Sequence, residues 1–247
     1  MRTGISTASL FMRQYNEDAV QTINRLGVKT CEIFLETFSE YTRAYGELLN
    51  ERKGNLSVNS VHLFTTNLEP QLFSENERTR KDAFYFLGEA MNAANAFGAK
   101  YYTFHGTARY KKNSRSGLND NFPKIGAALE ATRQLCEKYG VALSLETVEW
   151  STYNRPGVFK ELLKYCPRLF ATFDIKQTRI SGYPESEYLK ELPSHIRTFE
   201  QVLSYYPNQV YIGNQTPDDL AAVPQPWCDK TCDVNDRYGK FGQMMPQ

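Results

Sequence analysis

Cysteine and histidine are scarce in this chain, whose 247 residues include five cysteines and three histidines. An odd number of irregularly spaced cysteines argues against a disulfide framework, because a chain of this length can bury its own core. Reduced thiols in a cytoplasmic protein are the simpler interpretation. Cys228 and Cys232 lie close together, but no second cysteine or histidine pair follows them. We therefore expect no structural zinc site there.

Long apolar runs and strong net charge are also absent. The mean hydropathy is −0.54 and no apolar run approaches ~18 residues, so we expect no transmembrane helix. Residues 1–7 contain no apolar segment of signal-peptide length, which also favours the cytoplasm. With 29 Lys and Arg against 28 Asp and Glu, the net charge is +1. The chain thus carries no global signature of nucleic-acid or membrane binding.

The glycine-rich motifs of dinucleotide and phosphate binding are missing, although strand and helix patterns alternate along the chain. The alternation predicts parallel strands joined by helices. Six such units end near residue 192, at roughly 32 residues each, which is the spacing of a (β/α)₈ TIM barrel of about 250 residues. Strands are expected at 3–6, 30–36, 58–64, 100–105, 141–146 and 169–174. Helices are expected from residue 16 to Gly27 and at 39–50, 76–97, 119–139, 156–165 and 184–192.

Ionisable side chains stand at the ends of five successive predicted strands: Glu36, His62, His105, Glu146 and Asp174. In a parallel barrel the carboxyl ends of all strands lie on one face, where the active site forms. Glu36 alone is also compatible with an exposed strand end. Glu146 and Asp174 follow strongly apolar strands, so each carboxylate needs a partner charge or a metal ion. Oxygen ligands suit Mg²⁺ or Mn²⁺, and added imidazoles admit Zn²⁺, Co²⁺ or Fe²⁺.

A family resemblance rests on these strand ends. Val61-His62, Phe104-His105-Gly106, the segment from Leu145 to Trp150, and Phe173-Asp174-Ile-Lys-Gln177 resemble motifs of the xylose-isomerase-like TIM barrels. That superfamily includes sugar phosphate isomerases and epimerases and the endonuclease IV type of abasic-site nuclease. The nuclease branch would place a histidine three residues after the aspartate, where this chain has Gln177. The similarity covers residues 1 to about 198 and favours the isomerase branch.

The resemblance implies a divalent metal ion, Mn²⁺ or Mg²⁺ first and Zn²⁺ or Co²⁺ next, held by Glu146 and Asp174. Glu146 would also act as the catalytic acid and base. His62 and His105 match positions that line the substrate site in the isomerases and bind metal in the nuclease. Lys176 is a candidate for contacting a substrate oxygen or phosphate, or for an exposed salt bridge. Trp150 would form an apolar wall, and Glu36 is a further candidate for substrate binding.

The C-terminal region departs from the family pattern. Residues 1–198 read as six barrel units, whereas residues 199–247 contain neither the metal-binding histidine of strand seven nor the glutamate that ends strand eight. Units seven and eight are therefore expected to be missing or aberrant, with 209–212 as the best remaining strand candidate. Two explanations stay open: a divergent replacement of these units, or a reading frame shifted near Thr198, which we favour.

The leading hypothesis is a sugar isomerase or epimerase that works through a metal-stabilised enediolate. The protein would bind a small sugar or sugar phosphate, and it could form a homo-oligomer. Half of the family's metal ligands are missing, so weak Mn²⁺ binding and impaired activity are expected. The alternatives are a metal-dependent phosphodiesterase of the endonuclease IV type and a non-enzymatic truncated barrel. The net charge of +1 and the three histidines argue against the nuclease.

Overall fold

Eight strands close into a barrel in the order of the chain, in a computed structural model that describes residues 2–64, 68–107, 121–192, 194–202 and 209–213. Neighbouring strands from β1 to β7 pair in parallel, whereas β8 is antiparallel to both β7 and β1. The strands are β1 (Arg2–Ser6), β2 (Thr30–Leu35), β3 (Ser57–Leu63), β4 (Tyr101–Phe104), β5 (Ala142–Glu146), β6 (Phe170–Asp174), β7 (Ile196–Val202) and β8 (Gln209–Gly213).

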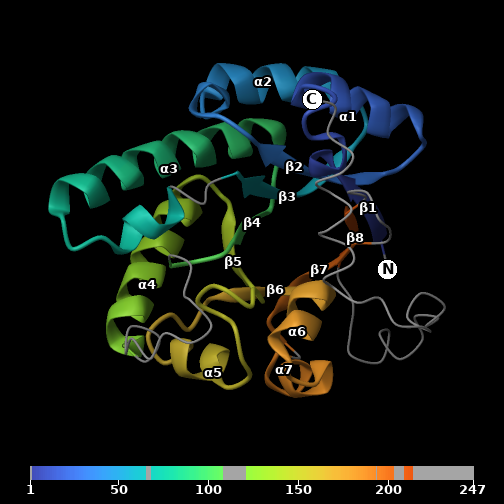
Figure 1. Ribbon diagram of the computed structural model, residues 1–247. Coiled ribbons are helices and arrows are strands. Elements are labelled where there is room, and N and C mark those ends of the chain that lie inside the picture. Colours follow the sequence, from blue (N-terminus) through green and yellow to red (C-terminus); the bar gives the residue numbers. More distant parts are fainter. Residues whose placement is uncertain (1, 65–67, 108–120, 193, 203–208, 214–247) are drawn as a thin grey trace, which may run out of the picture.

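The helices lie outside the ring of strands and follow one another around it, from α1 and α2 to α6 and α7 (Figure 1). Their bounds are α1 (Asn16–Arg25), α2 (Arg43–Arg52), α3 (Glu77–Phe97), α4 (Phe122–Lys138), α5 (Val158–Leu162), α6 (Ile175–Ser181) and α7 (Glu185–Glu191). Short 3₁₀ turns occur at η1 (Thr7–Leu10), η2 (Phe38–Glu40) and η3 (Glu69–Phe73). Within the described ranges, no helix combines the length and apolar character needed to cross a bilayer.

The longest helix, α3, has the boundaries that its sequence predicts. The Asn76 side chain accepts hydrogen bonds from the backbone N–H groups of Arg78 and Thr79, and so caps the first turn. Gly98 ends the helix in the left-handed conformation, at φ 81°, which a glycine adopts without steric cost. Capping at both ends explains why the expectation for residues 76–97 is confirmed.

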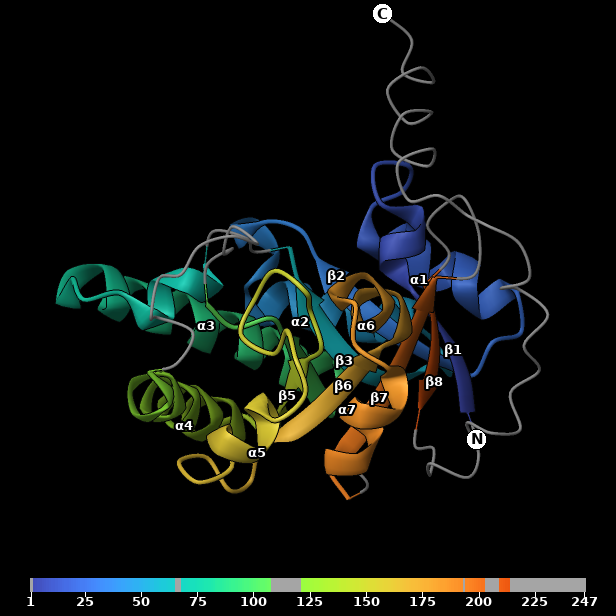
Figure 2. The same ribbon diagram turned by 60° about the horizontal axis from the view of Figure 1, so that its bottom comes forward.

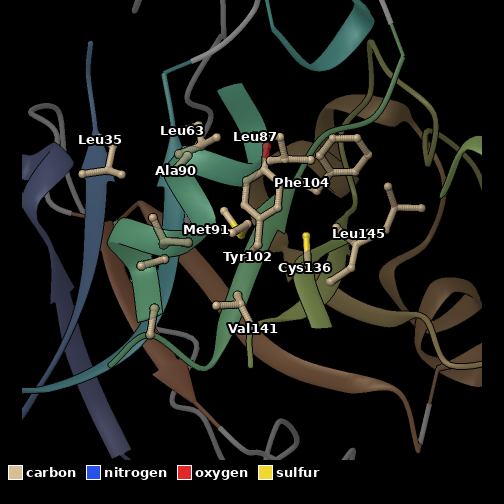
Figure 3. Close-up of a cluster of buried hydrophobic side chains, with 14 of the residues drawn as sticks. Leu35, Leu63, Leu87, Ala90, Met91, Tyr102, Phe104, Cys136, Val141 and Leu145 are labelled. Carbon is tan, nitrogen blue, oxygen red and sulfur yellow. The ribbon is translucent and has the colours of Figure 1, made fainter. Parts of the chain in front are cut away.

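Side chains on the barrel strands alternate between two environments, as the two-residue period of a strand requires. Apolar residues point outward and pack against the helices, where they form the main core. Figure 3 shows this layer between β2 to β5 and the helices α3 and α4, with Leu63, Phe104 and Leu145 on the strands facing Leu87 and Met91 on α3. All five of these side chains are fully buried.

The strand residues between these apolar positions carry polar side chains. Seven of them, each 0% exposed, come from seven different strands: Ser6, Glu32, Ser60, Thr103, Ser144, Thr172 and Thr198. They bond to one another across the strands, for example Ser144 Oγ to Thr172 Oγ1 at 2.8 Å. Barrel interiors are more often filled by branched aliphatic residues. A polar layer therefore lies along the strands, before their carboxyl ends.

Several local expectations are corrected by the structure. Asn16, whose residue type makes it a candidate N-cap, is instead the first residue of α1, and Tyr15 is the N-cap. The side-chain amide of Asn16 donates to the Phe34 carbonyl oxygen at 2.7 Å. The helix expected over 39–50 divides into η2 and α2, since a capping box at Thr37 closes the first turn and Thr42 caps the second. The helix expected from Pro156 begins only at Val158. Helix α6 was not expected from the sequence.

The last two strands confirm that units seven and eight are aberrant. β7 pairs in parallel with β6, with a register shift between Ala171 and Thr172, and the boundary expected at residue 198 falls inside β7. β8, which confirms the strand expected at 209–212, runs antiparallel and closes the barrel against β1 (Figure 2). In a complete (β/α)₈ barrel all strands are parallel. Residues 214–247, including Cys228 and Cys232, lie outside the described residues.

Candidate metal centre and active site

Two histidines meet at the carboxyl ends of neighbouring strands. His62 lies near the end of β3 and His105 directly follows β4. His62 pairs with Thr103 in the sheet, so both rings point to the same side of the barrel wall. The two Nε2 atoms are 3.1 Å apart, and 8% and 16% of the His62 and His105 side chains are exposed. The predicted convergence of these two histidines is thus what the structure shows.

Glu146 and Asp174 end the next two strands, β5 and β6. Oε2 of Glu146 lies 3.2 Å from Nε2 of His105, and it is buried without a hydrogen-bond partner among the described residues. The Asp174 carboxylate caps α6 by accepting the backbone N–H of Gln177 at 2.8 Å. The charge of Asp174 reaches Glu146 and contributes to raising the pKa of the Glu146 carboxyl. Four of the five expected strand-end residues therefore form one continuous cluster.

A third carboxylate, Glu69, anchors His105 from the opposite side. Glu69 opens η3 and is 1% exposed. Its Oε2 lies 3.2 Å from Nδ1 of His105 and accepts the backbone N–H of the same residue at 3.0 Å. The hydroxyl of Tyr102 donates to its Oε1 at 2.7 Å. Glu69 thus ties the segment after β3 to the end of β4 and holds the His105 ring in place.

A fourth carboxylate, Glu32, lies beneath His62 in the polar layer of the barrel. It is 0% exposed and accepts hydrogen bonds from Ser6 (3.0 Å), Ser60 (2.8 Å) and Thr103 (3.2 Å). Its Oε1 is 3.7 Å from Nδ1 of His62. A buried carboxylate requires such donors to offset the loss of water. The hydroxyl residues of three strands therefore make a charged group tolerable at this depth.

Burial and mutual charge shift the pKa values of these groups. The pKa of Glu146 is raised to about 8, first by burial and then by the charges of Asp174, Glu32 and Glu69, which outweigh the lowering effect of His105. Burial alone would lower the pKa of His105, but the charges of Glu69 and Glu146 raise it to about 9. Burial also raises the pKa of Asp174. Such shifts are typical of functional sites.

The donor set fits a divalent cation. One ligand atom each from His62, His105 and Glu146 lies within 4.8 Å of the others. Two imidazole nitrogens and a carboxylate oxygen form a common set of ligands for Zn²⁺ and related transition metals. The buried Oε2 of Glu146, which lacks a hydrogen-bond partner among the described residues, is the kind of atom that a cation would satisfy.

Aromatic rings flank the histidine pair. The Phe34 ring meets His62 edge-on at 5.3 Å between centroids, and the Trp150 ring lies tilted against His105, also at 5.3 Å. Trp150 therefore stands beside the cluster, where the sequence places an apolar wall.

The remaining two expected residues lie apart from the histidines. Lys176 is exposed on the first turn of α6, and its charge contributes to lowering the pKa of Asp174. Glu36 is half-buried among acidic neighbours; burial and the charges of Glu40 and Glu17 raise its pKa. Its backbone N–H donates to Glu40.

Glu32 and Glu69 were missed by the sequence analysis. Glu32 interrupts an apolar strand with a charge, which is a signal that could have identified it. Glu69 gave no such signal, since only the path of the chain after β3 brings it to His105.

Comparison with known proteins places this geometry in a family. The model of the xylose isomerase-like TIM barrel family matches residues 20–210. A D-tagatose 3-epimerase-like protein superposes with a TM-score of 0.63 and 18% identity, over 78% of this chain and 74% of its own. A D-psicose 3-epimerase, solved in the presence of D-fructose, superposes with a TM-score of 0.62 and 9% identity, over 81% of this chain and 74% of its own. At these identities the likeness concerns the fold.

A further match covers a short stretch. Sixty-six residues, 26% of this chain, are 56% identical to the glycine/sarcosine/betaine reductase complex component C subunit beta of Peptoclostridium acidaminophilum, and span 13% of that protein. So small a share supports no statement about the activity of this chain. The family match covers most of the barrel, including all four clustered strand-end residues. The chain therefore belongs to the xylose isomerase-like TIM barrel family.

Proposed function

We propose that this protein is a sugar isomerase or epimerase whose active site is the cluster at the carboxyl ends of β3 to β6. The observation that supports this most directly is the meeting of His62, His105, Glu146 and Asp174 on four consecutive strands. Structural neighbours include proteins described as sugar 3-epimerases, one of them solved with D-fructose. The proposed substrate is accordingly a small ketose or its phosphate.

The cluster would hold a divalent metal ion through His62, His105 and Glu146, with Asp174 beside it. This set of metal ligands differs from the one expected from the sequence, which was Glu146 and Asp174. The two histidines, expected there to bind substrate, are proposed here as metal ligands. Two imidazoles favour Zn²⁺, Co²⁺ or Mn²⁺ over Mg²⁺, which prefers oxygen ligands alone. Such an ion would polarise the substrate carbonyl and stabilise the negative charge that develops when the neighbouring carbon loses its proton.

Glu146 is assigned to move that proton. Isomerisation and epimerisation of a ketose both begin by removing a proton from the carbon next to the carbonyl group. A base works best when its pKa lies near the operating pH. Burial together with nearby carboxylates raises the pKa of Glu146 in the metal-free protein, and a bound cation would lower it again. The charge of Asp174 acts on Glu146, so a proton held by one carboxyl would leave the other available to the metal ion.

Trp150 and Lys176 are assigned to substrate binding. The indole ring against His105 offers an apolar surface for the C–H face of a sugar. Lys176, exposed at the start of α6, would contact a phosphate or hydroxyl group at the far end of the substrate.

Hydrogen exchange in D₂O tests this function without knowledge of the product. The protein, loaded with Zn²⁺, Co²⁺ or Mn²⁺ in turn, is incubated with a panel of ketoses and ketose phosphates, and proton NMR follows the carbon next to the carbonyl. We expect deuterium to replace that hydrogen in at least one sugar. Glu146→Gln should abolish the exchange, whereas Glu51→Gln, on the exposed side of α2, should leave it unchanged. Exchange that survives Glu146→Gln would contradict the assigned role.

A second candidate is a metal-dependent phosphodiesterase of the endonuclease IV type. The observation in its favour is the His62, His105 and Glu146 cluster, because the resemblance assigns metal binding to the two histidine positions in the nuclease branch. Against it stand the near-neutral net charge and the glutamine at position 177. A nicking assay on duplex DNA with one abasic site separates the two functions, and we expect no cleavage.

A further inference from the structure

Each histidine of the cluster has a buried carboxylate behind it. Nδ1 of His105 lies 3.2 Å from Oε2 of Glu69, and Nδ1 of His62 lies 3.7 Å from Oε1 of Glu32. The two Nε2 atoms face each other at 3.1 Å. The four side chains therefore lie in the order Glu69, His105, His62, Glu32. Glu146, at the end of β5, contacts Nε2 of His105 in the middle of this row.

This order constrains where the ring protons sit. A neutral imidazole carries one N–H, and a carboxylate beside Nδ1 favours the proton there. Both Nε2 atoms then present lone pairs to the same point. Two lone pairs at 3.1 Å repel each other unless a proton or a cation lies between them. A geometry in which one proton or one cation must lie between the two Nε2 atoms is also the one that a shared metal ion requires.

We propose that Glu32 and Glu69 are positioning residues that hold His62 and His105 with the proton on Nδ1, so that both Nε2 atoms are directed at one metal ion. This inference rests on the metal site of the proposed function. Neither carboxylate belongs to the proposed set of metal ligands. Their role is to select the tautomer and fix the plane of each ring.

Both carboxylates are themselves held rigidly, as a positioning role demands. Hydroxyl groups from β1, β3 and β4 fix Glu32, so it cannot rotate away from His62 without losing three hydrogen bonds. Glu69 accepts from the Tyr102 hydroxyl and from the backbone N–H of His105. Only the contact from Glu69 is within hydrogen-bonding distance, because Nδ1 of His62 is buried without a hydrogen-bond partner among the described residues and faces Glu32 at 3.7 Å. We therefore expect the loss of Glu69 to have the larger effect.

Zinc affinity provides the first test. Competition titration with a chromophoric chelator compares wild type with Glu69→Gln and Glu32→Gln. We expect Glu69→Gln to weaken zinc binding by about 10- to 100-fold, and Glu32→Gln by an amount near the lower end of that range. The matched control is Glu40→Gln, which alters another buried glutamate that accepts hydrogen bonds outside the cluster. This control should bind zinc like wild type.

The second test observes the rings directly and would not respond to a merely structural role. Long-range ¹H–¹⁵N NMR correlation spectra show one pattern for each of the three histidine rings. His195, whose Nδ1 lies 3.1 Å from the Leu169 carbonyl oxygen, serves as the internal reference. In zinc-loaded wild type, His62 and His105 should show metal-shifted Nε2 and protonated Nδ1. Glu69→Gln should change the pattern of His105 first, and Glu32→Gln that of His62, while His195 keeps its own.

The outcomes separate this inference from the function on which it rests. If wild type binds no zinc through His62 and His105, the proposed metal site itself fails. If wild type binds zinc and both variants match it in affinity and ring pattern, the positioning role is overturned and the metal site stands.

Should Glu69→Gln fail to fold, Tyr102→Phe removes one hydrogen bond to Glu69 with almost no change of shape. It should weaken zinc binding several-fold, and an unchanged affinity would overturn the inference equally.

Discussion

Nε2 of His62 and Nε2 of His105 lie 3.1 Å apart at the carboxyl ends of β3 and β4, with Oε2 of Glu146 3.2 Å from the latter. Forty-two residues and the whole of α3 separate the two histidines in the chain. The parallel register of β3 and β4 brings them together. The relationship therefore depends on the pairing of these two strands, and it ties the candidate metal site to the fold.

Removing any one ligand of the cluster should weaken metal binding strongly. His62→Ala, His105→Ala and Glu146→Gln each delete one of three donors, and the loss should exceed the 10- to 100-fold that is typical of residues behind the ligands. Calorimetric titration with Zn²⁺ measures it, with Glu51→Gln on α2 as the exposed control. Affinity within a few-fold of wild type in all three variants would mean that the ion binds elsewhere.

The metal-free protein should lose stability as the pH rises from about 5 to 9. Glu146 and His105 have folded-state pKa values of about 8 and 9, above the ordinary values of 4.5 and 6.5. The folded state thus binds more protons than the unfolded state across this range, so its stability is fully present at the acid end and falls as each group deprotonates. Asp174, whose pKa is also raised by burial, adds to the same trend.

Thermal melting in the presence of a chelator measures this trend. Glu146→Gln removes one titration, so its melting temperature should depend less on pH than that of wild type. Added Zn²⁺ should stabilise wild type most at the alkaline end, where protons no longer compete for the ligands. A metal-free melting temperature that rises from pH 5 to 9 relative to the variant would contradict the assigned shifts.

The interface between α3 and the barrel should dominate stability. Leu87 is 0% exposed and packs in the layer that Figure 3 shows. Leu87→Ala leaves a cavity and should cost about 2–5 kcal/mol of unfolding free energy in urea denaturation. Leu26→Ala makes the same chemical change at a site that is 67% exposed and should cost far less. Equal losses of unfolding free energy in the two variants would show that packing in this layer does not stabilise the protein.

Two helical glycines should respond in opposite directions to alanine. A Cβ on Gly46 of α2 would come within 2.8 Å of the Ala93 Cα on α3, so Gly46→Ala should destabilise the protein by about 1–3 kcal/mol. A Cβ on Gly88 would find its nearest atom, the Tyr139 hydroxyl oxygen, at 3.5 Å. Gly88→Ala should therefore stabilise α3 by about 0.5–1 kcal/mol. Thermal or urea denaturation of both variants checks the contrast.

Much of the barrel was predictable because its signals are local. Residues 76–97 carry a capping asparagine, a helical period and a terminal glycine, and the helix ends where these residues place it. The expected strands from 3–6 to 169–174 all appear, within two residues of their predicted ends. Helix α6 was missed because it begins at Ile175, directly after Asp174 ends β6, with no loop to mark the change from strand to helix.

The site was predictable only where it coincides with strand ends. His62, His105, Glu146 and Asp174 could be grouped because parallel strands align their carboxyl ends. Glu36 follows the same rule at the end of β2, yet its charged neighbours are Glu40 and Glu17. Glu69 reaches the cluster through a turn whose path no sequence pattern reveals. The antiparallel direction of β8 likewise depends on tertiary closure against β1.

X-ray absorption at the zinc K-edge of the loaded protein tests the central claim most directly. The account predicts two imidazole nitrogens at about 2.0–2.1 Å together with carboxylate oxygen, and one imidazole fewer in both His62→Ala and His105→Ala. A shell made only of oxygen atoms, or an imidazole count that neither substitution changes, would contradict the assignment of His62, His105 and Glu146 as one metal site.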